Sequence, residues 1–372
     1  MLGNYKGVAG RKRIHIEKRN HQLVFKKLVA GDFAANDAGK YVGHMGERTI
    51  GRMSNARKEK PFRQVTHRSA LNAQLPPDAV LKKLLKNFLQ EDLGAAGDVT
   101  SNAMISARSQ ATAYVVARTA GVLAGARLVQ LLAGMVRPAL AVRVLLRDGE
   151  RVRKGQQIVR LDGSLRGILL LERTMLNLLG RLSGVATFTN AFATQVKGTK
   201  ARIRDTRKTT PGLRALEKYA VVCGGGVSHR SGLFDAFLAK DNHVAGLTPR
   251  RMAHDIHQAI GAARHKYKLK FAMVEVDTLD QLDGLLRLPN GVIDAILLDN
   301  MSLITLRKSV ALRDRLAPGV QLEASGGVTL KTVAAIAQCG VDFVSVGAIT
   351  HSAPQIDFAM DIQSLSPKKG RS

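Results

Sequence analysis

Six short apolar runs separated by helical patterns occupy residues 201–348, and they limit the folds open to this chain. They recur roughly 22 to 36 residues apart, which is the rhythm of β-strand–α-helix units. Several runs are apolar at consecutive positions, as expected of parallel strands covered on both faces. Six such units predict an open α/β barrel of fewer than eight strands, with an open doubly wound sheet as the alternative. The runs are "ARIRD" (201–205), "AFLAK" (236–240), "FAMVEVD" (271–277), "AILLDN" (295–300), "QLEASGG" (321–327) and "FVSVGA" (343–348).

The chain between residues 76 and 190 has a different pattern, which suits antiparallel strands with helices. A helix is expected after Pro76-Pro77, where leucines recur at helical spacing. The alternating segments "QATAYVVAR" and "ALAVRVLLRDGERVRKGQQIVRLDG" predict strands with turns at 148–149 and 162–163. A further helix is predicted in "RGILLLERTMLNLLGRLSG".

The spacing V-x-x-G-x-x-I-x-x-L-x-G at 152–163 also occurs in lipoyl-type carrier domains. A carrier would need a lysine at a turn tip with the flanking residues of that family, and this segment does not provide one. We therefore interpret the pattern as architecture; a search for a lipoyl or biotinyl mass addition would test the carrier alternative.

Both ends of the chain are basic. Residues 1–75 carry sixteen Lys and Arg against five Asp and Glu and lack sustained periodicity, which favours a disordered extension. The alternatives are an RNA-binding or targeting segment, or translation that begins at Met45 or Met53. Residues 365–372 form a short basic tail.

Composition narrows the class of protein. The 57 Lys and Arg exceed the 29 Asp and Glu, a surplus that suits nucleic acid or small, highly anionic substrates. Aromatic residues are 4% and Trp is absent, which leaves few stacking platforms for RNA. Cys223 and Cys339 are far apart and predict small buried side chains rather than a disulfide or zinc site. With no apolar run long enough to span a bilayer, we expect a soluble, cytoplasmic protein without a membrane partner.

Polar side chains gather where the predicted strands end, and functional groups of parallel α/β folds lie at the carboxyl ends of strands. Arg207, Lys208, Arg230 and Lys240 form a cationic group suited to carboxylates or phosphates. His229 directly precedes Arg230.

Two carboxylates and two glycine loops complete this set. Glu275 and Asp299 stand among cations, which fits a Mg²⁺ ion shared with substrate oxygens. The loops at 325–327 and 346–348 follow the last two strands, where glycine lets backbone N–H groups approach a phosphate.

Seven segments that occur in order between about residues 76 and 362 closely resemble one family. They are "EDLGAAGDVTS", "LLERTMLNLLGRLSGVAT", "KARIRDTRKTTPGLRALEKYAVVCGGGVSHRSGLFDAFLAKDNH", "VEVDTLDQL", "ILLDN", "LEASGGVTL" and "VDFVSVGAITHS". The family is quinolinate phosphoribosyltransferase, also called nicotinate-nucleotide pyrophosphorylase (carboxylating). The resemblance implies a decarboxylating transfer from phosphoribosyl pyrophosphate to quinolinate, giving nicotinate mononucleotide, pyrophosphate and CO₂ with Mg²⁺ in NAD biosynthesis.

The resemblance also implies an architecture. Residues 76–190 would form an N-terminal α/β sandwich completed by 350–364, and residues 191–349 would form the open barrel. The family works as a homodimer whose site borrows an arginine from the partner, and "LLERT" supplies Arg173 for that role.

The resemblance assigns a role to each motif position, and no position is substituted. Arg207, His229, Arg230 and Lys240 would hold the quinolinate carboxylates, joined by Arg173 across the dimer. Glu275 and Asp299 would position metal and ribose, and Lys240, Glu275 and Asp299 are the catalytic candidates. The donor would be bound by Thr206 and Lys208, and its 5′-phosphate by Ser325, Gly326, Gly327, Val346, Gly347 and Ala348. A molybdenum-operon relative of the same fold is the alternative function, and a basic-tail RNA-binding module is the non-enzymatic one.

Overall fold

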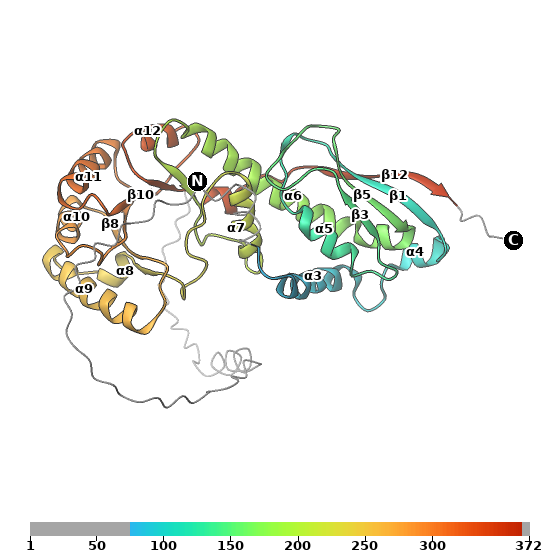
Figure 1. The fold of residues 1–372 in the computed structure, drawn as a ribbon, viewed down its shortest axis with the longest axis horizontal. Coiled ribbons are helices and arrows are strands. Elements are labelled where there is room, and N and C mark those ends of the chain that lie inside the picture. The colour runs from blue at the N-terminus through green and yellow to red at the C-terminus, as the bar shows by residue number, and fades with distance from the viewer. Residues whose placement is uncertain (1–74, 367–372) are drawn as a thin grey trace, which may run out of the picture. The chain divides into compact units, whose positions relative to one another are not determined.

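The computed structural model describes residues 75–366 (Figure 1). The predictions for residues 1–75 and 365–372 concern segments that lie almost wholly outside the described residues. Within the described residues the chain forms a four-stranded antiparallel sheet, a six-stranded parallel sheet and a two-stranded ribbon. None of the described helices is long and apolar enough to cross a membrane.

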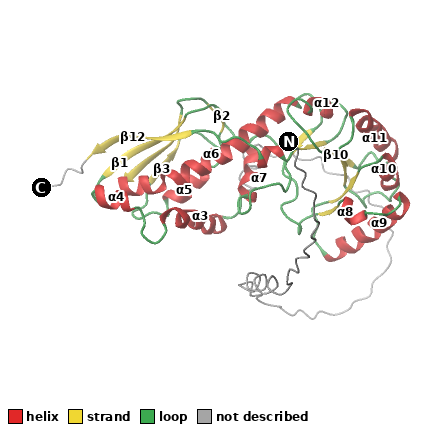
Figure 2. Ribbon diagram, turned by 180° about the vertical axis from the view of Figure 1, so that it is seen from behind, coloured by secondary structure: helices red, strands yellow, loops and turns green. Residues whose placement is uncertain are grey.

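The antiparallel sheet has the strand order β12-β1-β5-β3, so the last strand of the chain pairs with the first. Helices α5 and α6 pack against one face of it, and α3 packs against these two helices, as Figures 1 and 2 show. β1 alternates between partly exposed and buried positions over most of its length, because only one face of the sheet is covered. The elements are α3 (Asp78–Leu93), α4 (Val99–Met104), β1 (Gln110–Ala117), β2 (Gly121–Val122), α5 (Ala126–Ala133), β3 (Ala141–Val144), β4 (Arg151–Val152), β5 (Gln157–Ser164), α6 (Leu165–Gln195) and β12 (Phe358–Ser366).

One of the two predicted turns in this region is wrong. Residues 148–149 do lie between β3 and β4, but Asp162 and Gly163 lie inside β5 and pair with β1. The Asp162 carboxylate accepts hydrogen bonds from Thr112 on β1 and from Arg160 on its own strand. Gly163 has a φ of 147° and a Cβ there would lie 2.9 Å from Cδ2 of Leu140, so backbone conformation and packing within the strand favour glycine without a turn.

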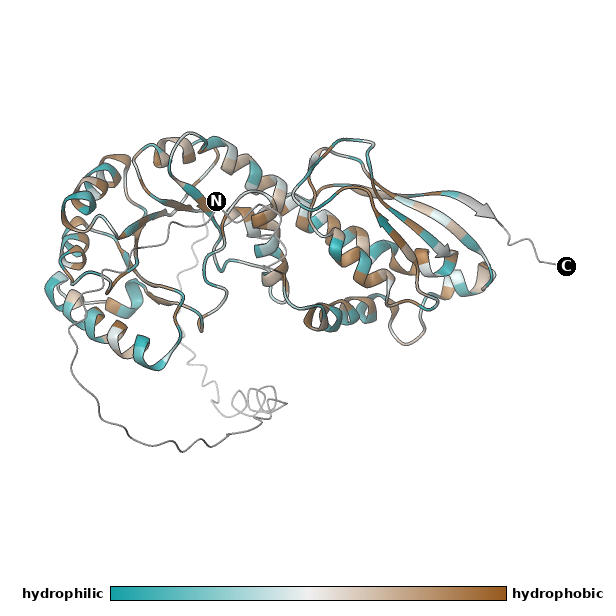
Figure 3. Cartoon of the chain, in the orientation of Figure 1, coloured by the Kyte–Doolittle hydropathy of each residue, from teal (hydrophilic) through white to brown (hydrophobic). Residues whose placement is uncertain are grey.

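The parallel sheet curls into an open barrel. Its order is β6-β11-β10-β9-β8-β7, so the first strand pairs with the last, and only an isolated bridge between Arg204 and Val227 lies beyond β6. The predicted barrel of fewer than eight strands is confirmed, as are all six predicted strands. In Figure 3 these strands are largely hydrophobic in colour. The elements are β6 (Arg202–Arg204), α7 (Arg214–Cys223), β7 (Phe237–Ala239), α8 (Asp241–Val244), α9 (Pro249–Lys266), β8 (Ala272–Val276), α10 (Leu279–Leu286), β9 (Ala295–Asp299), α11 (Leu303–Leu316), β10 (Gln321–Ser325), α12 (Val333–Ala337), β11 (Phe343–Ser345) and α13 (Ala348–His351).

Two other sequence predictions hold in the described residues. Cys223 and Cys339 are free and buried, as expected of small apolar side chains. The 152–163 pattern forms part of the antiparallel sheet and its neighbouring ribbon, in keeping with an architectural role.

The long helix α6 contacts both the antiparallel sheet and α7, and small residues let other segments approach it closely. A Cβ atom on Gly184 would overlap the carbonyl oxygen of Pro354 and lie 3.0 Å from Cα of Gln355. A Cβ on Gly180 would lie 2.8 Å from the carbonyl oxygen of Ile356. The segment that leads into β12 therefore crosses α6 at backbone contact distance.

We expect Gly184→Ala to lower the free energy of unfolding by about 3 kcal/mol, because the methyl group has only backbone to displace. The matched control is Gly261→Ala on α9, where a Cβ would meet nothing within 4 Å. That substitution is expected to stabilise by about 0.5–1 kcal/mol, since alanine is the better helix former. Urea unfolding of both variants measures the difference, and equal stability would contradict the close crossing.

Candidate active site

A cavity of about 820 Å³ opens at the carboxyl ends of the barrel strands. It is lined by residues that lie within or directly after β7, β9, β10 and β11, by Glu275 within β8, by residues that follow β6, and by residues of the segment before β7. Of the residues predicted from sequence, those that line it are Thr206, Arg207, Lys208, His229, Arg230, Lys240, Glu275, Asp299, Ser325, Gly326, Gly327, Gly347 and Ala348.

Two predicted residues do not line the cavity. Val346 is buried behind it, and its backbone N–H already donates to the carbonyl of Arg204 in the sheet. Arg173 is exposed on α6, away from the barrel cavity of its own chain.

The cationic side of the cavity is built around His229 and Arg230. The backbone N–H of Arg230 donates to Nδ1 of His229 over 2.7 Å, so the neutral ring carries its proton on Nε2. Burial, then the charges of Arg204, Lys218 and Arg230, lower the pKa of His229 to about 3. His229 is thus a neutral hydrogen-bond donor at physiological pH rather than a cation. Burial and the nearby charge of Arg207 also lower the pKa of Arg230.

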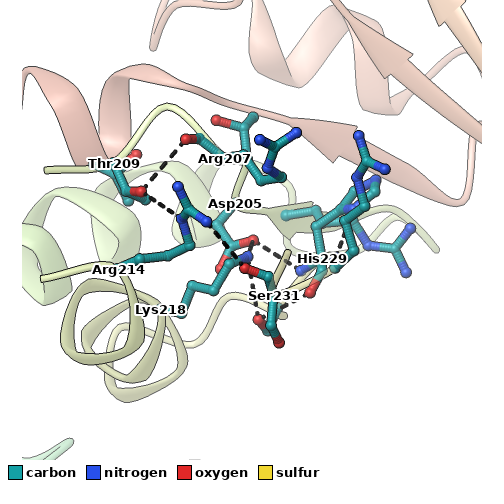
Figure 4. A network of polar contacts seen from close by, with 12 residues as sticks. Asp205, Arg207, Thr209, Arg214, Lys218, His229 and Ser231 are labelled. Atoms are coloured by element: carbon teal, nitrogen blue, oxygen red, sulfur yellow. Dashed lines mark hydrogen bonds and ion pairs between the residues drawn. The ribbon is translucent and has the colours of Figure 1, made fainter. Parts of the chain in front are cut away.

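A buried ion pair between Lys218 and Asp205 anchors the backbone of His229. Lys218 on α7 donates to Oδ1 of Asp205, and the same oxygen accepts the backbone N–H of His229 over 2.8 Å (Figure 4). Burial works against both charges, raising the pKa of Asp205 and lowering that of Lys218. Asp205, the polar residue that directly follows β6, is therefore structural.

Arg214 links the segment that carries Arg207 and Lys208 to the segment that carries His229 and Arg230. Its Nε donates to Oγ1 of Thr209 over 3.0 Å, and its Nη1 donates to the carbonyl of Ser231 over 3.4 Å. Figure 4 shows Arg214 between the segments that carry Arg207 and His229. This side chain adds a second link between the two segments, beside that of Asp205 to the backbone of His229.

The carboxylates occupy neighbouring strands and have different partners. Glu275, nearly buried on β8, pairs with Nζ of Lys240 at 2.5 Å. Asp299, at the end of β9, accepts the side-chain amide of Asn300 over 2.7 Å. In the part of the chain that the structure describes, no three metal-ligating side chains cluster.

Glycine is needed in the loop after β10 because of close packing. Gly326 has a φ of 94°, and a Cβ there would overlap Oδ1 of Asn300 and lie 2.9 Å from its backbone N. Gly327 has a φ of 56° and open space around it. At the other loop, a Cβ on Gly347 would lie 3.1 Å from Cδ of Lys208, so the lysine stem lies over that glycine.

Glu323 is the main site residue that the sequence reasoning missed. It is fully buried on β10, lines the cavity floor, and pairs with Arg204 at 2.6 Å. Its other oxygen accepts the hydroxyl of Ser345 and lies 3.5 Å from Nε2 of His229. A charged residue inside the apolar run "QLEASGG" was the available signal. The other missed lining residues are Leu238, Leu297, Asn300, Val328, Thr329, Ser345 and His351.

Comparison with known proteins gives consistent matches. The model of the quinolinate phosphoribosyl transferase C-terminal domain matches residues 185–361, and the model of the N-terminal domain matches residues 98–183. Together they cover the barrel and most of the antiparallel part.

Individual proteins that are similar to this chain carry names of the same family as the matching domain models. The nicotinate-nucleotide pyrophosphorylase (carboxylating) of Mycobacterium leprae is 44% identical over 280 residues, covering 75% of this chain and 95% of that protein. The probable nicotinate-nucleotide pyrophosphorylase (carboxylating) of Bacillus subtilis is 38% identical, covering 76% and 93%. The solved nicotinate-nucleotide pyrophosphorylase from Francisella tularensis superposes with a TM-score of 0.69 at 34% identity, covering 78% of this chain and 98% of that one.

Proposed function

The chain belongs to the quinolinate phosphoribosyltransferase family, and we propose that its barrel cavity transfers the phosphoribosyl group of phosphoribosyl pyrophosphate to quinolinate. The pyridine nitrogen forms a bond to C1 of the ribose as the bond from C1 to pyrophosphate breaks. The bond from C2 of the ring to its carboxylate then breaks, CO₂ leaves, and C2 takes up a proton. The products are nicotinate mononucleotide, pyrophosphate and CO₂. The reaction is an entry step to NAD.

The observation that carries this proposal is that two guanidinium groups, those of Arg207 and Arg230, line the same cavity. Arg207 and Arg230 lie close enough for the charge of Arg207 to lower the pKa of Arg230. Two such groups side by side favour a ligand with adjacent anionic groups, and quinolinate carries two carboxylates on neighbouring ring carbons.

The chain's own residues divide between the two substrates. Arg207 and Arg230 bind the carboxylates, and His229, whose Nε2 lies 3.5 Å from Oε1 of Glu323, donates its Nε2–H to one of them when quinolinate binds. Lys240 is 45% exposed and can turn from Glu275 to a substrate carboxylate. These contacts orient the ring nitrogen toward the ribose, which supplies much of the rate gain expected from a positioned reactant.

The donor side is formed by the glycine loops and Lys208. The backbone N–H groups near Gly326, Gly327 and Gly347 are able to approach the 5′-phosphate without obstruction from a side chain. Lys208, whose stem lies over Gly347, supplies a point charge to the same phosphates.

Glu275 and Asp299 are the residues that would hold Mg²⁺. Two carboxylates on adjacent strands fit an ion that takes most of its ligands from water and substrate oxygens, as Mg²⁺ does with phosphates. When bound, the ion neutralises charge that develops on the pyrophosphate leaving group. The pairing of Glu275 with Lys240 holds the carboxylate in place before substrate arrives.

A second copy of the chain would complete the site. Arg173 is exposed on α6 and outside its own cavity, although the family resemblance assigns it to the carboxylates. Its exposure supports a homodimer in which each Arg173 enters the partner's cavity.

A direct assay tests the function. The purified chain is incubated with phosphoribosyl pyrophosphate and Mg²⁺ plus either quinolinate or nicotinate, and nicotinate mononucleotide is measured. We expect product from quinolinate and none from nicotinate. Product from nicotinate alone, or no product from either, would contradict the proposal.

Arg230→Ala separates the two substrates kinetically. We expect the apparent KM for quinolinate to rise about 30-fold or more, because a charge-assisted bidentate contact worth about 2–3 kcal/mol is lost. The KM for phosphoribosyl pyrophosphate is expected to change much less. Steady-state kinetics with each substrate varied in turn gives both values, and equal increases would argue against the carboxylate role.

A further inference from the structure

A buried carboxylate that does not line the cavity connects three segments around it. Glu217 on α7 is fully buried, and its oxygens accept four hydrogen bonds. Arg181 on α6 donates two of them, over 2.7 and 3.0 Å. Thr210 donates the other two, from its backbone N–H over 3.0 Å and from its hydroxyl over 2.8 Å. The carboxylate therefore fixes the far end of the segment that begins with Thr206.

Arg181 also contacts the segment that follows β11 and carries Gly347. Arg181 also donates to the carbonyls of Thr350 and Ala353. Thr350 is fully buried in α13, directly after the Gly347–Ala348 turn. The arginine thus joins Glu217 to the chain that follows β11.

A third contact closes the ring. The hydroxyl of Thr350 donates to the carbonyl of Lys208 over 2.7 Å. From Lys208 the chain runs two residues to Thr210, which returns to Glu217. The backbone of Lys208 is consequently held at its own carbonyl by Thr350 and two residues further on, at Thr210, by Glu217.

We propose that Arg181 and Glu217 are a positioning pair that sets where Lys208 presents its ammonium group to the phosphates of phosphoribosyl pyrophosphate. Neither side chain of the pair is among the residues that line the cavity, so neither touches substrate. They act through the backbone of Lys208 and through the Gly347 turn, which forms the other wall of the same subsite. This inference rests on the proposed function for the identity of the ligand.

The geometry explains why the pair serves the donor rather than quinolinate. The beginning of the same segment is fixed independently, because Asp205 is held by Lys218 and by the backbone of His229. Losing Glu217 removes the anchor at Thr210, two residues after Lys208, but leaves Asp205 and the His229 side anchored. A buried carboxylate that only stabilised the fold would have no such directional effect.

The test is direct binding, independent of turnover. Binding of phosphoribosyl pyrophosphate with Mg²⁺, and of quinolinate, is measured by titration calorimetry for the wild type and for Glu217→Gln. We expect the dissociation constant for phosphoribosyl pyrophosphate to rise about tenfold or more, as for a contact displaced by a fraction of an ångström. The constant for quinolinate is expected to change by less than about threefold.

Two further variants make the test decisive. Thr350→Val removes the hydroxyl that holds Lys208 but leaves the ion pair, and should weaken phosphoribosyl pyrophosphate binding about three- to fivefold. If Glu217→Gln does not fold, the result for Thr350→Val tests the inference in its place. Asp283→Asn is the matched control, since it removes a carboxylate from an exposed ion pair with Arg287 and should change neither constant.

Unchanged donor binding in folded Glu217→Gln and in Thr350→Val, or equal weakening for both ligands, would overturn the inference. If the wild type binds no phosphoribosyl pyrophosphate at all, the proposed function fails and the inference falls with it. A wild type that binds the donor normally while the variants do not separate the two ligands would overturn the positioning pair alone.

Discussion

Mixing two inactive variants, Arg173→Ala and Lys240→Ala, is expected to restore activity. If each site combines Lys240 of one subunit with Arg173 of the other, a mixed dimer contains one site in which both residues are intact. With random exchange of equal amounts, half the dimers are mixed, so activity should approach about a quarter of the wild-type value. Each variant alone should lose about 100-fold or more, since each lacks a cation that binds a buried carboxylate.

The control for this experiment uses the double variant Arg173→Ala/Lys240→Ala mixed with Arg173→Ala. In that mixture every site lacks at least one of the two cations, so no recovery is expected. Subunit exchange is confirmed independently, for example by co-purification of a tagged with an untagged copy. Confirmed exchange without recovery in the first mixture would show that Arg173 does not enter the partner's cavity.

The barrel and most of its site could be predicted from sequence because local patterns encode them. Each strand is a short apolar run, and the group that follows it, such as Lys240 after β7 or Asp299 at the end of β9, lies at the same end of the sheet by topology alone. For these residues the position at a strand end is enough to place the side chain in the cavity.

Residues whose roles depend on distant partners were not predictable in this way. Asp205 follows β6 as Lys240 follows β7, yet its carboxylate faces Lys218 and the chain before β7 rather than the cavity. Glu217 and Arg181 lie on different helices, and nothing in either helical pattern indicates their pairing. The turn predicted at 162–163 failed for a related reason, since a glycine that permits close packing has the same sequence signature as a turn glycine.

Gly326→Ala is expected to reduce kcat/KM for phosphoribosyl pyrophosphate by about 100-fold, which corresponds to about 2.7 kcal/mol. The added methyl group would overlap the side chain of Asn300 and lie 2.9 Å from its backbone N. Asn300 has little freedom to move away, because its φ is 51°, its N–H donates to Ser325 and its amide donates to Asp299. The displacement would therefore be transmitted to Asp299, the carboxylate proposed to hold metal and ribose. The strained φ of 94° adds to the cost.

The adjacent glycine provides the matched control. Gly327→Ala adds the same methyl group to the same loop, but its φ of 56° lies in the left-handed region that other residues reach at about 1–2 kcal/mol, and a Cβ there meets nothing within 4 Å. We expect this variant to lose less than about tenfold in kcat/KM. If the loop served only through its flexibility, both substitutions would reduce activity equally. A larger effect at Gly326, accompanied by a weaker response to Mg²⁺, would locate the effect in the contact with Asn300 and Asp299, and equal losses would contradict it.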